Sequence, residues 1–126
     1  MVLKIAHRGA SGYEPENTLS AFYRAVNLGC DMIEIDVRVC ASGQVVVMHD
    51  DTVDRTTDGK GRVADLDFET LKKLDAGGGE RIPTLIQVLD RMKGKVGLNI
   101  ELKEPAAVGP VCDAIQTHVR DAEWSY

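Results

Sequence analysis

The segment that decides the fold reads DMIEIDVRVCASGQVVVMHD and spans residues 31–50. Its first part alternates strictly, so three apolar side chains lie on one face of a predicted strand while Glu34 and Asp36 lie on the other. A second apolar run begins at Val45, only a few residues after the first run ends. Because a parallel crossover needs about a dozen residues or more, the segment predicts an antiparallel β-hairpin.

The register of this hairpin decides which polar side chains face the carboxylates. A four-residue loop would pair Val39 with Gln44, and that register sets Glu34 opposite His49 on the same face. A slip of one residue would place Asp50 there instead. In either register, a histidine–aspartate pair comes close to the strand that carries the carboxylates.

Strand and helix patterns alternate on both sides of the hairpin. Asn17 is the expected N-cap of the first helix and Asp67 that of the second. Thr84 and Gln87 form a capping box for the third helix. The remaining expected elements are strands at 2–6 and 96–103 and helices from 19 to a stop at 29, from 68 toward 74, from 85 through 92, and from about 106 to 120. This alternation predicts a mainly parallel α/β sheet with helices outside it.

The composition narrows the classes of protein to consider. The 126 residues suffice for one domain with a core. A net charge of −5 and a pI near 5.1 argue against a nucleic-acid-binding protein. No apolar run approaches the roughly 20 residues of a membrane span, and the N-terminus shows no signal-peptide pattern. Three cysteines without a CxxC pair predict free thiols in a reducing compartment, so we expect a cytoplasmic protein.

Carboxylates on strand faces are the first indication of chemistry. Glu34 and Asp36 share one face of their strand, and Glu101 and Lys103 share the polar face of the strand at 96–103. A buried carboxylate is costly unless it is paired or bound to a metal. The pattern therefore suggests a hard cation with oxygen ligands, Mg²⁺ or Ca²⁺. A solvated sheet face, or pairing of the carboxylates with Lys103, would explain the pattern equally well.

Two histidines follow apolar strand runs. His7 stands beside Arg8, and His49 stands beside Asp50. In a parallel barrel the carboxyl ends of the strands hold the active site, and histidines exchange protons near neutral pH. A single histidine at a strand end is more often structural, but two of them together with three carboxylates favour a site.

Seven short motifs occur in order along the chain: His7-Arg8-Gly9, Pro15–Thr18, Glu34-x-Asp36, His49-Asp50, Asp54–Thr57, Ile82–Leu85 and Asn99–Lys103. Together they resemble the glycerophosphodiester phosphodiesterase family. The resemblance implies that Glu34, Asp36 and Glu101 match the family's metal ligands. It also implies that His7 and His49 match the acid–base pair, that Arg8 and Lys103 match cationic groups contacting the phosphate, and that Glu16 lies near the site.

The family's activity is what the resemblance implies for function. It is the hydrolysis of glycerophosphodiesters to glycerol 3-phosphate and an alcohol, with one divalent cation, Mg²⁺ or Ca²⁺. The family's route is attack by the substrate's own 2-hydroxyl, giving a cyclic phosphate that water then opens. Two alternatives remain: a related phosphodiesterase acting on lysophospholipids or other lipid head groups, and a catalytically inactive half-barrel that serves as an interaction module.

The length of the chain is the departure from the family. The family's domain is a (β/α)8 barrel of about 250 residues, so residues 1–126 are expected to form the N-terminal half of one barrel domain. The expected fold is a partial TIM-type barrel of the α/β class with a β-hairpin after the second strand. Open sheet edges and exposed apolar faces predict self-association or a missing C-terminal half.

Overall fold

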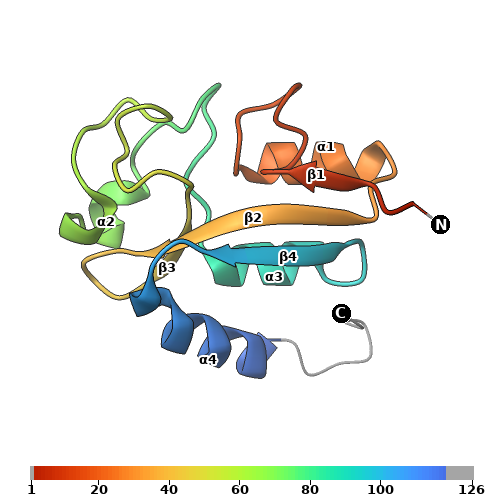
Figure 1. Cartoon of the computed structure of the whole chain (residues 1–126). Coiled ribbons are helices and arrows are strands. Elements are labelled where there is room, and N and C mark those ends of the chain that lie inside the picture. The colour runs from red at the N-terminus through yellow and green to blue at the C-terminus, as the bar shows by residue number, and fades with distance from the viewer. Residues whose placement is uncertain (1, 119–126) are drawn as a thin grey trace.

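A long strand, β2 (Met32–Val39), lies at the centre of a four-stranded sheet in the computed structural model, which describes residues 2–118 (Figure 1). Two strands pair with β2 in parallel, β1 (Ile5–His7) and β4 (Gly97–Leu102). The third partner, β3 (Val45–Val47), is antiparallel to β2 and completes the predicted hairpin. The four expected strands and the single antiparallel partner are therefore confirmed, although β1 begins later than residue 2.

β1 and β3 pair with the same edge of β2, one after the other. Backbone carbonyls alternate in direction along a strand, so those of Glu34 and Asp36 point the same way. The first accepts from Arg8 N at 2.9 Å, just beyond β1, and the second accepts from Met48 N at 2.8 Å, just beyond β3. The ends of these two strands therefore meet halfway along β2.

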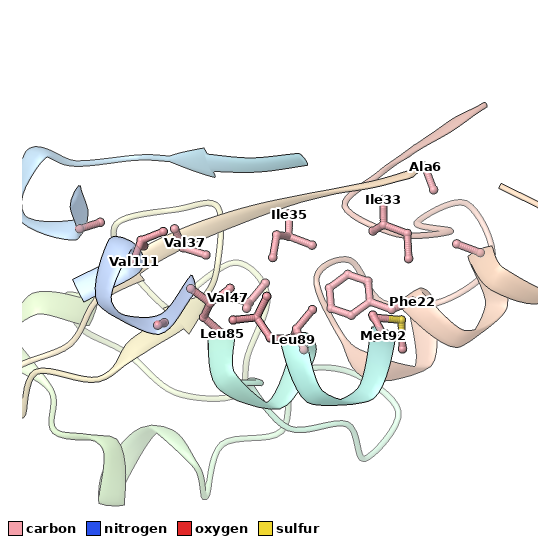
Figure 2. Close-up of a cluster of buried hydrophobic side chains, with 14 of the residues drawn as sticks. Ala6, Phe22, Ile33, Ile35, Val37, Val47, Leu85, Leu89, Met92 and Val111 are labelled. Carbon is pink, nitrogen blue, oxygen red and sulfur yellow. The ribbon is translucent and has the colours of Figure 1, made fainter. Parts of the chain in front are cut away.

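Helices cover one face of the sheet. Their apolar stripes meet Ile33, Ile35 and Val37 of β2, which are all fully buried (Figure 2). This confirms the predicted apolar face of the strand. The core-forming helices are α1 (Leu19–Asn27), α3 (Leu85–Met92) and α4 (Val108–His118), and the shorter elements are α2 (Phe68–Leu71) and the 3₁₀ turns η1 (Val63–Asp65) and η2 (Pro105–Ala107).

The opposite face of the sheet is partly open within residues 2–118. Ile5 pairs with Met32 and so lies on the face of Glu34, and 49% of its surface is exposed. No helix between residues 2 and 118 is both long and apolar enough to cross a membrane. The predicted free cysteines are confirmed, since none of the three forms a disulfide.

Local capping signals fix where α1, α2 and α3 begin. Thr84 and Gln87 form the predicted capping box, and Asp67 accepts from Thr70 N as an N-cap. The predicted N-cap at Asn17 is wrong, because the next residue, Thr18, caps α1. Asn17 has a positive φ of 55°, and its side chain donates to Asp36 of β2 instead.

The hairpin turn corrects two further expectations. Val39 pairs with Val45 rather than Gln44, because a tight turn from Cys40 is followed by Gly43 at φ 92°, which adds one residue to the loop. β3 ends at Val47, so neither residue of the His–Asp pair joins the strand ladder.

The second helix, α2, ends well before residue 74, and the expected end of the last helix at residue 120 lies outside the described residues.

Gly9 provides a test of how tightly the turn after β1 packs on α1. Its φ is +81°, and a Cβ there would lie 2.8 Å from the Ala21 Cβ and 2.9 Å from Phe22 Cδ1. Gly9→Ala should therefore lower the free energy of unfolding by about 1–3 kcal/mol, the usual cost of overpacking. Gly12→Ala is the matched control, since a Cβ there meets nothing within 4 Å. Equal denaturation midpoints for the two variants would contradict this packing.

Candidate active site and metal centre

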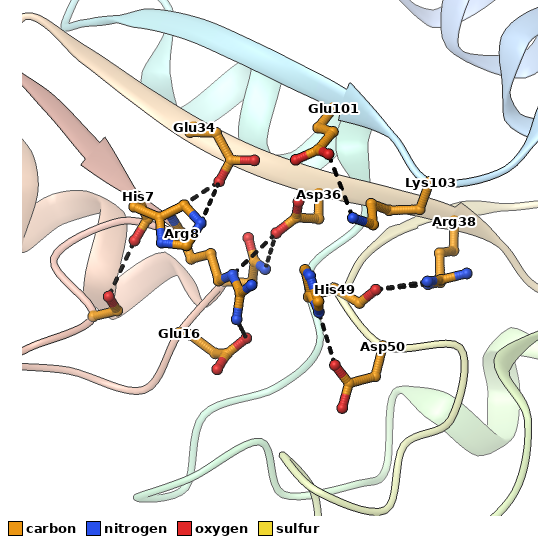
Figure 3. A network of polar contacts seen from close by, with 12 residues as sticks. His7, Arg8, Glu16, Glu34, Asp36, Arg38, His49, Asp50, Glu101 and Lys103 are labelled. Carbon is orange, nitrogen blue, oxygen red and sulfur yellow. Dashed lines mark hydrogen bonds and ion pairs between the residues drawn. The ribbon is translucent and has the colours of Figure 1, made fainter.

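Three carboxylates converge on the polar face of the sheet (Figure 3). The parallel register sets Asp36 of β2 beside Glu101 of β4, and the alternation of β2 puts Glu34 on the same face. One ligand atom from each residue lies within 4.8 Å of the others. Glu34 and Asp36 are buried, with 8% and 0% of their surface exposed, whereas Glu101 is open to solvent.

Each of the two buried carboxylates has one oxygen with a hydrogen-bond donor and one without. Arg8 N donates to Glu34 Oε1 at 3.2 Å, and Asn17 Nδ2 donates to Asp36 Oδ2 at 3.0 Å. Glu34 Oε2 and Asp36 Oδ1 are buried and have no hydrogen-bond partner. Unsatisfied buried carboxylate oxygens are costly. A hard divalent cation, which takes oxygen ligands, fits this donor set.

Burial and the proximity of the three carboxyls shift pKa values in the cluster. Burial, together with the neighbouring carboxyls of Glu101 and Asp36, raises the pKa of Glu34 to about 7. Hydrogen bonding to Glu34, with smaller contributions from Asp36 and Lys103, lowers the pKa of Glu101. A proton on Glu34 therefore stabilises the cluster near neutral pH when no cation is bound.

The end of β1 places a histidine and an arginine against this cluster. His7 Nε2 lies 3.9 Å from Glu34 Oε1, and 69% of the His7 side chain is exposed. Arg8 has a positive φ of 60°, which turns the chain out of the strand. Its guanidinium lies between Glu16, at 3.1 Å, and Asp36, at 3.5 Å.

The second histidine lies where the chain leaves β3. His49 Nδ1 is 2.8 Å from Asp50 Oδ1, and the His49 carbonyl accepts from Arg38 Nε at 3.0 Å and Nη2 at 2.7 Å. Figure 3 shows the ring between Asp50 and the carboxylate cluster. Sequence reasoning missed Arg38, although the alternation of β2 puts it on the same face as Asp36.

Lys103 follows β4, and its Nζ lies 3.4 Å from Glu101 Oε1. The carboxylate–lysine pairing that the sequence left open is thus present beside the three-carboxylate cluster. Sequence reasoning assigned no role to Arg55, whose guanidinium lies within hydrogen-bond distance of both Asp50 and Glu16. It also misread Asn17, which binds Asp36 rather than capping a helix.

Residues 7–124 match the model of the glycerophosphoryl diester phosphodiesterase family. The protein YhdW of Bacillus subtilis is 58% identical over 83% of this chain and 46% of its own length. The glycerophosphodiester phosphodiesterase of Caldanaerobacter subterraneus is 51% identical over 86% of this chain and 48% of its own length. The chain thus spans about half the length of the curated relatives it matches.

Solved structures are similar to this chain both in fold and in sequence. A glycerophosphodiester phosphodiesterase from Agrobacterium tumefaciens aligns with a TM-score of 0.90 and 38% identity over 96% of this chain and 56% of its own. A phosphodiesterase of Oleispira antarctica, solved in complex with the product sn-glycerol-3-phosphate, aligns with a TM-score of 0.89 and 37% identity over 94% of this chain and 53% of its own. The chain belongs to the glycerophosphoryl diester phosphodiesterase family.

Proposed function

We propose that this chain supplies the metal centre and the acid–base pair of a metal-dependent phosphodiesterase that hydrolyses glycerophosphodiesters to glycerol 3-phosphate and an alcohol. The observation that carries the proposal is the cluster of Glu34, Asp36 and Glu101 with its two unsatisfied buried oxygens. Family membership supports the reaction class, and the product bound to the Oleispira phosphodiesterase supports the glycerol phosphate part of the substrate.

Glu34, Asp36 and Glu101 would hold one divalent cation, Mg²⁺ or Ca²⁺. Such a cation supplies Lewis acidity toward a phosphate oxygen and a template for the glycerol hydroxyl. Asn17 and the Arg8 amide orient the two buried carboxylates by binding their other oxygens. The free oxygens are thereby left available for the cation.

His7 and His49 would move the protons. One imidazole removes the proton of the substrate's attacking 2-hydroxyl, and the other donates a proton to the leaving alkoxide. A cyclic phosphate forms and is then opened by water, with the two histidines acting in the reverse sense. The exposed His7 ring beside Glu34 and the His49 ring held by Asp50 come from the two strand ends that meet along β2.

Arg8 and Lys103 would contact the phosphate. Each of these cations already faces a carboxylate of the cluster, Asp36 for Arg8 and Glu101 for Lys103. A substrate phosphate therefore enters a site in which the positive groups are already oriented. Ordering them beforehand removes part of the entropy cost of binding.

We further propose that the complete domain is a TIM-type barrel whose remaining strands close the open face. The partly exposed Ile5 and the solvent-facing Glu101 support this, because both lie on the face that a closed barrel would enclose. The described residues form one wall of the substrate pocket, and the wall on the alcohol side would come from the later strands.

Cation binding should depend on pH, because Glu34 must lose its proton to become a ligand. The raised pKa of about 7 means that the proton competes below neutrality, so the apparent affinity for Mg²⁺ or Ca²⁺ should rise as the pH increases through 7 and then level off. Titration calorimetry in two buffers of different ionisation enthalpy measures both affinity and proton release. Glu34→Gln should weaken binding by about 10-fold or more, and Glu69→Gln, an exposed control, should leave it unchanged. Wild-type affinity that is independent of pH would contradict this assignment.

Replacement of the histidines tests the acid–base pair. His7→Ala and His49→Ala should each lower kcat of the complete enzyme by about 100-fold or more, the usual scale for such groups. Cation affinity measured in the same variants should change little. His118→Ala is the matched control, since His118 pairs with Asp90 on the helical side. Turnover at the wild-type rate in both variants would remove these histidines from the mechanism.

The need for the second half can be measured directly. Residues 1–126 alone should cleave glycerophosphocholine little or not at all with Mg²⁺ or Ca²⁺, and should self-associate in light-scattering measurements, because open sheet edges pair with other chains. The full-length Caldanaerobacter relative serves as the positive control. Comparable activity from a monomer of 126 residues would show that the described wall is sufficient.

A further inference from the structure

Arg55 joins two loops that each carry a residue of the proposed site. Its Nε and Nη2 donate to both carboxylate oxygens of Asp50, at 2.8 and 3.1 Å. Its Nη1 and Nη2 donate to both oxygens of Glu16, at 2.8 and 3.1 Å. The planar guanidinium thus binds two carboxylates in the forked geometry that lysine cannot reproduce.

Each of these carboxylates also binds a residue of the site. Asp50 Oδ1 contacts His49 Nδ1 at 2.8 Å, and Glu16 Oε2 accepts from Arg8 Nη1 at 3.1 Å. Arg55 therefore stands at the centre of a chain of contacts with the histidine at one end and the arginine at the other. Hydrogen bonding to Arg55 is the main cause that lowers the pKa of both Asp50 and Glu16.

The ionised state of Asp50 determines which nitrogen of His49 carries the proton. A carboxylate can only accept, so the neutral ring must donate from Nδ1, and Nε2 is left as the acceptor. A neutral imidazole in water that is not held in this way populates both tautomers. The side of the ring opposite Asp50 faces the carboxylate cluster (Figure 3), where the substrate would lie.

We propose that Arg55 is a positioning residue that keeps His49 in the Nδ1–H tautomer by holding Asp50 against it, with Glu16 as the anchor on the other loop. The expected effect on turnover rests on the proposed function, whereas the tautomer of His49 follows from the geometry alone. It gives a role to Glu16 and to the Asp54–Thr57 motif, to which the sequence analysis assigned none.

The surroundings of Arg55 distinguish it from an ordinary surface ion pair, which contributes little to stability. The side chain is 51% exposed, but its backbone is anchored. Val53 is fully buried, and the Thr57 hydroxyl donates to the Val53 carbonyl at 2.7 Å. A guanidinium that donates four hydrogen bonds from a fixed backbone orients its partners more than it stabilises the fold. Removing the Arg55 side chain should therefore change the tautomer of His49 and the rate of turnover.

The first readout is the tautomer of His49, measured by long-range ¹H–¹⁵N NMR at about pH 8.5, well above the ordinary histidine pKa of about 6.5. The His49 signals are assigned by their loss in His49→Gln. Wild type should show Nδ1–H alone, and Arg55→Met should show a mixture of both tautomers. Arg62→Met replaces another exposed arginine of the same loop and should keep the wild-type pattern. An unchanged Nδ1–H tautomer in Arg55→Met overturns the proposal.

The second readout is the division between kcat and KM in the complete enzyme. Arg55→Met should lower kcat by about 10-fold, the scale for partners of site residues, with KM and cation affinity nearly unchanged. Asp50→Asn removes the carboxylate that holds His49 Nδ1, which is the contact through which Arg55 acts. The double variant with Arg55→Met should therefore be no slower than Asp50→Asn alone. Arg55→Lys keeps the charge without the fork and should fall between wild type and Arg55→Met, which keeps the test available if the methionine variant does not fold. Losses of kcat that add up in the double variant overturn the proposal. If the wild-type enzyme shows no turnover, the proposed function is refuted, and the tautomer of His49 still decides the role of Arg55.

Discussion

The fully buried carboxylate of Asp36 is the constraint on which the rest of the site depends. It lies halfway along β2, where β1 and β3 meet on one edge of the strand, and the side-chain donors to it come from the segment that leaves β1. Asn17 supplies a hydrogen bond and Arg8 an ion pair from one side, while the backbone of Met48 holds the Asp36 carbonyl from the other. A charge this deep requires such partners, and the same residues that satisfy it line the site.

Rules of short range made much of the fold predictable from the sequence. The alternation of β2 separates Ile33, Ile35 and Val37 from the carboxylates because the period of a strand is two. The Thr84–Gln87 capping box and the N-cap at Asp67 satisfy helix amides within three residues of chain. The order of motifs indicated the family, and the polar faces of β2 and β4 contain the three residues of the carboxylate cluster.

Contacts of longer range could not be predicted. The hairpin register depends on one additional residue in the turn at Gly43, and the residue paired with Glu34 is His7 of β1, because β3 ends at Val47. Asn17 satisfies the pattern of an N-cap, but Thr18 caps the helix and Asn17 Nδ2 donates to Asp36. Arg55 meets Glu16 across 39 residues of sequence, a pairing that no periodicity encodes.

The charge of the site explains how an acidic chain would bind the anionic substrate proposed for it. Three carboxylates facing one point would repel a phosphodiester, and burial together with the neighbouring carboxyls already raises the pKa of Glu34. Arg8 and Lys103 offset this only in part, since each is engaged by a carboxylate. A bound divalent cation reverses the local field. Affinity for the proposed phosphate substrate would therefore depend on the cation, and the net charge of −5 gives no information about the preference of the site.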